Sequence, residues 1–194
     1  TARFVNDFLD QWIDLRLIDF TAPDSDLYPE FDPLLRWSMI EETRAFFREL
    51  LDRDLSALNL VDSKFAMLND RLARQYGING VKGFELRKVA LGKGSPRGGV
   101  LTQGGVLKVT ANGATTSPVI RGVWVLDRIL GQRPDPPPPG AGSIEPDIRG
   151  ATPIREQLTK HRADKSCAAC HDAIDPLGFA LESFDVIGGY RERY

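Results

Sequence analysis

KSCAACHDAIDPLGFALESFDVIGGY, residues 165–190, contains the two cysteines of this sequence, Cys167 and Cys170, and His171 follows them directly. Cys-x-x-Cys-His is the spacing at which a c-type haem is attached to a polypeptide. Two thiols at this separation reach the two vinyl groups on one edge of a porphyrin, and the next residue brings its imidazole to the iron. The stretch therefore predicts one covalent haem c, with Cys167 and Cys170 as thioether anchors and His171 as an axial iron ligand.

Two other kinds of site share the Cys-x-x-Cys pattern. A structural zinc ion usually has four Cys or His ligands, and Cys167, Cys170, His161 and His171 would supply that number. Their spacing matches no common zinc finger, because His161 lies six residues before Cys167 and His171 adjoins Cys170. A dithiol oxidoreductase site is expected where a strand meets a helix, whereas a predicted helix and a polar turn precede this motif. Haem is the preferred interpretation, and zinc and dithiol chemistry are the alternatives.

The composition restricts the classes of partner and the location of the protein. The chain has 194 residues, 42% of them hydrophobic, with a formal net charge of −2. Near-neutral charge without basic runs argues against a nucleic-acid partner, and no apolar run approaches the roughly 18 residues of a membrane span. Covalent haem attachment takes place outside the bacterial cytoplasmic membrane. We therefore expect a periplasmic or extracytoplasmic location and a chain that is a piece of a longer exported protein.

The first part of the chain has the periodicity of packed helices. Residues 2–19 place apolar side chains at helical spacing, which predicts a first helix. Asp32 as N-cap and Pro33 at the first helical position predict a second. A third is expected to begin after Ser63 and to end at Gly77. The residues expected to face inward on the second and third helices are Leu35, Met39, Phe46, Phe47, Leu50, Phe65, Leu68, Leu72 and Tyr76.

The middle of the chain is rich in glycine and has β-prone pieces at residues 86–91 and 100–110. We expect one or two short strands or an extended loop there. The pairs Gly98-Gly99 and Gly104-Gly105 predict a close approach of the backbone, either to a flat group such as the haem or in tight turns. Arg97, beside them, is a candidate to bind a haem propionate.

A further helix and a proline-rich spacer follow. Ser117 and Pro118 predict the start of the helix and Gly131 its end, with Val123, Leu126 and Leu130 facing inward. Four prolines, Pro136–Pro139, then favour a stiff polyproline II spacer, with a ligand for an aromatic groove as the alternative. The sequence thus predicts a mainly α fold: a helical domain with a glycine-rich loop or short-strand insert (1–131), a spacer (132–148) and a small cytochrome c-like haem-binding module (149–194).

Several residues are candidates for the second axial ligand of the iron. A short helix predicted from Thr152 to about Arg162 places His161 on the same face as Ile154 and Leu158, which makes His161 the first candidate. A buried core histidine would show the same pattern. Met39 is the alternative and Met67 comes after it, although most methionines simply fill a core. An open position would instead permit small-ligand or peroxide chemistry.

The chain resembles the planctomycete-type cytochrome proteins, which are large exported multidomain proteins of Planctomycetes and related bacteria. The resemblance rests on TSPVIRGVWVLDRILG, PPPP and HRADKSCAACHDAIDPLGFALESFDVIGGYRERY. FVNDFLDQW, EETRAFFREL and RGGVLTQGGVL look like DUF1592, and residues from about 145 onward look like DUF1588. The resemblance implies a c-type cytochrome module within a larger protein. Its partners would be a redox protein, or other domains and haem subunits of the same assembly.

Likeness to cytochromes c also implies roles for residues after the motif. In those proteins a proline-containing loop often gives a backbone carbonyl to the second nitrogen of the proximal imidazole, and Asp175-Pro176-Leu177-Gly178 resembles that element. Phe179, with Leu181 and Phe184, would wall the haem pocket.

The leading function is electron transfer through one low-spin haem, rather than catalysis. One alternative is a haem enzyme, peroxidase-like or oxidase-like, with an open distal site. Another is a structural subunit of a cytochrome assembly. The sequence contains no recognisable Ser/His/Asp set or phosphate loop, and two histidines leave little room for acid–base catalysis.

Overall fold

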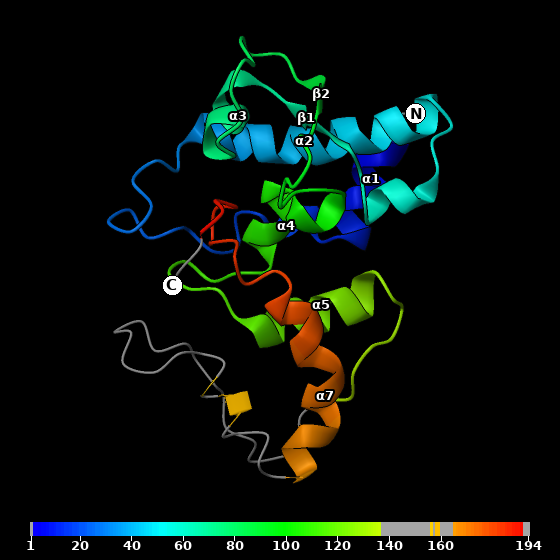
Figure 1. The fold of residues 1–194 in the computed structure, drawn as a ribbon, viewed down its shortest axis with the longest axis vertical. Helices are drawn as coiled ribbons and strands as arrows, with labels where there is room; N and C mark the ends of the chain where they lie inside the picture. Colours follow the sequence, from blue (N-terminus) through cyan, green and yellow to red (C-terminus); the bar gives the residue numbers. More distant parts are fainter. Residues whose placement is uncertain (1, 137–155, 157, 160–164, 192–194) are drawn as a thin grey trace. The chain divides into compact units, whose positions relative to one another are not determined.

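The computed structural model describes residues 2–136, 156, 158–159 and 165–191 (Figure 1). They belong to two compact units, which are described one at a time. The first unit combines the chain up to Ala114 with Phe184–Tyr190, and the second takes in Thr115–Ser183 and the residues from Arg191 onward. The described residues are mainly helical and include a small two-stranded sheet, as the sequence predicts.

In the first unit, helix α2 (Pro33–Asp52) begins where the sequence predicts. The Asp32 carboxylate accepts the backbone N–H of Leu35 at 2.6 Å, and Pro33 occupies the first turn, where its missing N–H is not needed. The predicted inward residues Leu35, Met39, Phe46 and Leu50 are buried, and Phe47 is half-buried.

Helix α1 (Ala2–Trp12) is shorter than the predicted helix over residues 2–19. Asp14 adopts a left-handed backbone conformation with φ 59°, and the chain continues as a 3-10 turn, η1 (Leu15–Leu17). One row of the apolar stripe is fully buried, namely Val5, Leu9 and Ile13. The neighbouring row, Phe4, Phe8 and Trp12, stays nearer the surface, and its rings contact one another in sequence. Phe8 and Trp12 also contact the ring of Phe47 on α2.

The segment after Ser63 corrects the prediction of a single third helix. Residues Phe65–Leu68 form strand β1, and helix α3 spans only Asp70–Gln75. All four residues of β1 are buried, so the segment lacks the alternation that identifies a strand, and a short apolar run fits a buried helix equally well. Gly77 follows α3 with φ 69°, which confirms its predicted capping position.

Strand β2 (Arg87–Ala90) lies within the predicted β-prone piece and pairs antiparallel with β1, Phe65 opposite Ala90. The second β-prone piece is instead helical, with a 3-10 turn, η3 (Val100–Thr102), and helix α4 (Gly104–Val109). The middle of the chain therefore contains one of the predicted one or two short strands, and the expectation of β structure at residues 100–110 is wrong.

The glycine pairs beside α4 pack against the first unit itself. A Cβ atom at Gly99 would collide with the backbone of Leu60, and one at Gly104 would lie 2.8 Å from the side chain of Met39. Close approach is the correct expectation, and the approaching group is the polypeptide rather than a flat cofactor.

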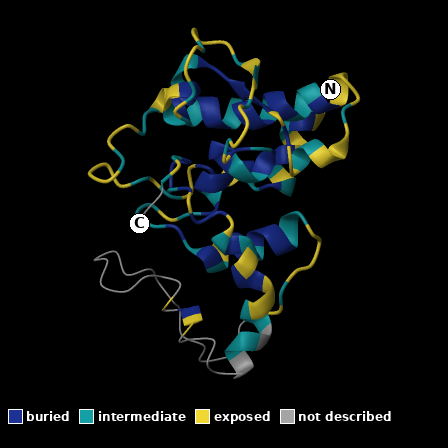
Figure 2. Cartoon of the chain, viewed as in Figure 1, coloured by how far each residue is buried: buried dark blue, intermediate teal, exposed yellow. Residues whose placement is uncertain are grey.

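The core of the first unit draws on both ends of the chain. Figure 2 shows buried residues along α2 and α4. One cluster combines residues of the N-terminal half with Val186 and Ile187, both fully buried. Its other members are Ile18, Leu35, Met39, Ala66, Leu68, Leu72 and Ala73. Residues near the C-terminus thus complete a core that the first helices begin.

The second unit contains helices α5 (Pro118–Arg128) and α7 (Lys165–Phe179). The Ser117 hydroxyl accepts the N–H of Ile120 at 3.4 Å, which confirms the predicted start of α5. The helix ends at Arg128, before the predicted end at Gly131, where the chain adopts φ 65°. The predicted inward face is partly wrong. Leu126 is buried, but Val123 is half-buried and Leu130 is 50% exposed, while Arg121, Trp124 and Val125 are buried.

The predicted spacer and the predicted helix that carries His161 lie largely outside the described residues. Within that helix, Leu158 is described and is buried, in line with its predicted inward position. None of the described helices is both long and apolar enough to cross a membrane.

Candidate functional site

Helix α7 carries the whole Cys-x-x-Cys-His motif. Residues three and four positions apart lie on the same face of an α-helix, so Cys167, Cys170 and His171 share one face of α7. All three side chains are half-buried. One rigid element therefore presents two thiols and an imidazole side by side.

The imidazole of His171 has a partner one turn further along α7. Its Nδ1 lies 2.8 Å from Oδ1 of Asp175, and the Asp175 side chain is 0% exposed. A carboxylate accepts hydrogen bonds, so Nδ1–H is the donor and Nε2 is the nitrogen that could bind a metal. Hydrogen bonding of this kind fixes the tautomer and the ring orientation of metal-binding histidines.

The carboxylate of Asp175 replaces the partner that cytochrome likeness implies. A loop at residues 175–178 is expected to offer a backbone carbonyl, but α7 continues through Pro176 to Phe179. Sequence reasoning missed the role of Asp175 because Asp-Pro resembles a loop start. The available signal was its position four residues after His171, where helical side chains meet.

Helix α5 supports α7 through contacts that only glycine permits. A Cβ atom at Gly122 would collide with the carbonyl oxygen of Ile174, and one at Gly178 would collide with the carbonyl oxygen of Pro118. The two backbones therefore touch at two points along α7. The fully buried Arg121 of α5 also donates to the carbonyl oxygen of Leu181 at 2.7 Å, just beyond the end of α7.

A cleft of about 300 Å³ opens beside Cys170. Its walls come from α7, from α5 and from the segment after α5; they consist of Cys170, Ala173, Ile174, Leu126, Gln132, Arg133, Pro134 and Asp135. Leu126 and Ile174 make part of the wall apolar, and Arg133 contributes a positive charge. Asp135 adds a negative charge beside that of Arg133, so the cleft offers an apolar ligand chiefly a thiol and an apolar wall.

The remaining predicted site residues are distributed over the chain. Pro176 is exposed on α7 and Phe179 is half-buried at its end. Met39 is fully buried in the core of the first unit, and His161 lies outside the described residues. The roles of Pro176 and Phe179 in a haem pocket, and the choice between His161 and Met39, stay predictions. Among the described residues, no three His, Cys, Asp or Glu side chains gather to hold a metal ion by themselves.

A second polar cluster lies inside the first unit and consists of Glu42, Tyr76 and Arg97. The hydroxyl of Tyr76 donates to Oε2 of Glu42 at 2.6 Å, and the backbone N–H of Gly104 donates to the Tyr76 oxygen at 2.6 Å. Burial raises the pKa of Glu42 to about 7, because the charged carboxylate loses its hydration.

Arg97 is committed to contacts inside this unit. Its guanidinium donates to the carbonyl oxygens of Thr102 at 2.8 Å and Gly188 at 2.5 Å, and its side chain is buried. These bonds explain the position of Arg97 without the haem propionate that the sequence suggested.

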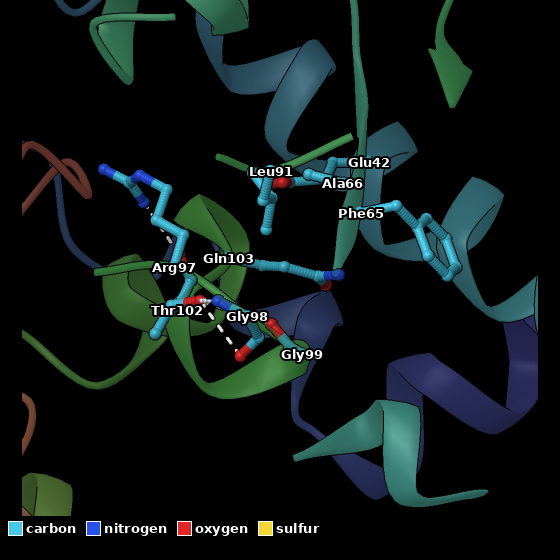
Figure 3. Close-up of a pocket in the computed structure, with 9 residues that line it drawn as sticks. All are labelled: Glu42, Phe65, Ala66, Leu91, Arg97, Gly98, Gly99, Thr102 and Gln103. Carbon is cyan, nitrogen blue, oxygen red and sulfur yellow. Dashed lines mark hydrogen bonds between the residues drawn. The ribbon is translucent and has the colours of Figure 1, made fainter. Parts of the chain in front are cut away.

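A small cavity adjoins this cluster, lined by Glu42, Phe65, Ala66, Leu91, Arg97, Gly98, Gly99, Thr102 and Gln103 (Figure 3). Figure 3 shows Gln103 extending between Leu91 and Gly99, with the guanidinium of Arg97 turned away from it. The volume open to a water-sized sphere is about 10 Å³, which is enough for one water molecule and too little for a substrate. The Oε1 atom of Gln103 is buried and finds no hydrogen-bond donor among the described residues. The cavity suits an internal water.

Comparison with known proteins places two domains of unknown function on the chain. The family model PSD4, described as a protein of unknown function (DUF1592), matches residues 1–78. The family model PSCyt3, described as a protein of unknown function (DUF1588), matches residues 97–194, which is half of the chain. No curated protein and no solved structure matches the chain. The chain therefore belongs to the PSCyt3 (DUF1588) family, with a DUF1592 segment preceding it.

Proposed function

We propose that the second unit is a c-type cytochrome module that carries single electrons on one covalently bound haem. The supporting observation is the arrangement on α7, where Cys167, Cys170 and His171 share one face and Asp175 orients the imidazole. The family name PSCyt3 points to cytochromes and agrees with this proposal.

The residues of the second unit fit a haem. The two thiols would bind the vinyl groups, and Nε2 of His171 would bind the iron. Leu126 and Ile174 would offer an apolar surface for the porphyrin. When bound, the haem supplies the one-electron Fe(III)/Fe(II) couple.

The protein's own residues would fix and shield this group. Backbone contact between α5 and α7 sets the motif-bearing helix against a neighbouring helix, which would limit the movement of the imidazole. The apolar wall excludes part of the solvent, and solvent access is one of the factors that set a redox potential. His161 is proposed as the sixth ligand, with Met39 as the alternative. The proposed location is periplasmic or extracytoplasmic, and the proposed partners are a redox protein or other haem-bearing parts of the same assembly.

Haem attachment is tested by producing the chain in the periplasm of bacteria that carry a c-type maturation apparatus. A pyridine haemochrome spectrum of a c-type haem is expected from the purified wild type. Cys170→Ala is expected to lose one thioether, which changes the haemochrome band position, and most of the holoprotein. Asp172→Asn, an exposed change on the same helix, serves as the control and should load haem normally. Wild-type protein without covalent haem, or Cys170→Ala with normal content, would overturn the proposal.

The reduced and oxidised spectra of the same protein test the electron-transfer role. A low-spin spectrum indicates that both axial positions are filled, as an electron carrier requires. His161→Ala is then expected to become high-spin, and an unchanged spectrum would move the ligand role to Met39, tested by Met39→Leu. A high-spin wild type would favour the haem-enzyme alternative.

A further inference from the structure

We propose that Asp175 is a positioning residue that lowers the reduction potential of the iron bound by His171. The inference deepens the proposed haem function and rests on it. It starts from one contact, the 2.8 Å separation of His171 Nδ1 and Asp175 Oδ1 on adjacent turns of α7.

The helix itself makes this contact durable. His171 and Asp175 stand four residues apart, so the backbone of α7 holds their side chains together without help from a loop. Ile174, beside Asp175 in the sequence, is the residue whose carbonyl oxygen touches Gly122 of α5. The pair therefore lies beside a point where the backbones of α7 and α5 touch.

The environment of the carboxylate strengthens the hydrogen bond. The Asp175 side chain is 0% exposed and the His171 side chain is 14% exposed. Hydrogen bonds to an ionised group are shorter and about twice as strong as bonds between neutral groups, and they gain further in a low-dielectric interior. A backbone carbonyl, the partner implied by cytochrome likeness, is neutral. It would attract the Nδ1 proton less strongly than the carboxylate of Asp175 does.

The consequence for the iron follows from the charge on the imidazole. A carboxylate that attracts the Nδ1 proton leaves more electron density on Nε2, and orienting partners of this kind raise the basicity of the ligand. A more electron-donating ligand stabilises Fe(III) relative to Fe(II). The potential is therefore lower than it would be with a neutral acceptor at the same place.

The midpoint potential of three haem-loaded variants tests the proposal. Asp175→Asn keeps the size of the side chain and removes its charge, and it is expected to favour Fe(II) by about tenfold, a rise of about 59 mV. Asp175→Glu keeps a carboxylate and is expected to fall between wild type and Asn. Asp172→Asn removes the same charge from an exposed position next to His171 and is expected to shift the potential much less. Equal shifts in Asp172→Asn and Asp175→Asn, or no shift in Asp175→Asn, would overturn the proposal.

A second measurement tests the role of Asp175 without haem and therefore also serves if a variant takes up none. Nitrogen-15 NMR of the histidine rings in haem-less protein distinguishes the Nδ1–H from the Nε2–H tautomer. Wild type is expected to hold His171 as Nδ1–H and Asp175→Asn to give a mixture, with the His161→Ala background assigning the signal. A mixture already present in the wild type would overturn the role of Asp175. Wild type that attaches no haem would instead overturn the proposed function, so the two failures are distinguishable.

Discussion

The guanidinium carbon of Arg97 lies 3.5 Å from the centroid of the Tyr76 ring. Tyr76 belongs to the segment that matches DUF1592 and Arg97 to the segment that matches DUF1588. Arg97 also binds the carbonyl oxygen of Gly188, close to the C-terminus. These Arg97 contacts and the buried Val186 and Ile187 show that residues from both family segments form the first unit. The N-terminal segment consequently lacks part of its own core.

Arg97→Ala is expected to lower the free energy of unfolding of the first unit by about 3 kcal/mol. Removing one partner of a buried ionic cluster leaves the remaining buried polar groups without compensation. Two carbonyl oxygens and the Glu42 carboxylate would lose their cation. Urea unfolding at pH 7 measures the loss. The exposed Arg74, paired with Asp70 on α3, offers a control, and Arg74→Ala should change stability by less than about 0.5 kcal/mol. Equal losses in the two variants would contradict the clamping role of Arg97.

The parts of the fold that sequence reasoning predicted correctly are those with local chemical causes. The cap formed by Asp32 and Pro33 and the glycine that ends α3, Gly77, depend on one or two residues each. A short side chain that accepts a backbone N–H, or a residue free to adopt positive φ, acts in the same way in almost any fold. The Cys-x-x-Cys-His motif is also local, and the haem that its spacing predicts stays a prediction.

The parts that sequence reasoning missed depend on distant segments. Phe65–Leu68 becomes a strand because Arg87–Ala90 pairs with it, which an apolar run does not reveal. Arg121 can be buried because the carbonyl oxygen of Leu181, just beyond α7, accepts a hydrogen bond from its guanidinium. An arginine on a helix normally indicates a solvent-exposed face. The contact of Asp175 with His171 was missed because Pro176, the next residue, suggested a loop. The separation of four residues between His171 and Asp175 is nevertheless the spacing at which side chains meet on a helix.

Glu42 is expected to make the stability of the first unit fall as the pH rises. Its pKa is about 7 in the folded protein, against an ordinary value of 4.5 for a solvated glutamate, which applies to the unfolded chain. Between these values the folded state binds a proton that the unfolded state does not, so the free energy of unfolding decreases by about 1.4 kcal/mol per pH unit from this group. The contribution is fully present below about pH 4.5 and is lost as the pH passes through 7.

Glu42→Gln should remove this slope, because the amide does not titrate. Urea unfolding at intervals between pH 4.5 and 8 measures it, and Glu41→Gln, one position earlier on α2, is the matched control. Glu41 faces Arg44 and Arg48, so its variant should keep the slope that Glu42 produces. A slope that persists unchanged in Glu42→Gln would show that the carboxylate titrates as it does in the unfolded chain.

Gly178→Ala is expected to separate α5 from α7 and to destabilise the second unit by about 3 kcal/mol, since overpacking against backbone cannot be relieved by a rotamer change. The added methyl would collide with the carbonyl oxygen of Pro118. The sign of the effect is diagnostic. Alanine favours a helix over glycine by about 1 kcal/mol, so without the collision the same substitution would stabilise α7.

Fluorescence of the buried Trp124 on α5 reports unfolding of this unit when Trp12 and Trp37 are replaced by Phe. Gly92→Ala in the first unit is the control for an added methyl that meets nothing within 4 Å, and it should leave the unfolding of the second unit unchanged. Covalent haem content should fall together with stability in Gly178→Ala, because the motif-bearing helix loses its support. A variant that unfolds at or above the wild-type urea midpoint would show that α5 and α7 do not touch at this glycine, and the rigid presentation of His171 would need another cause.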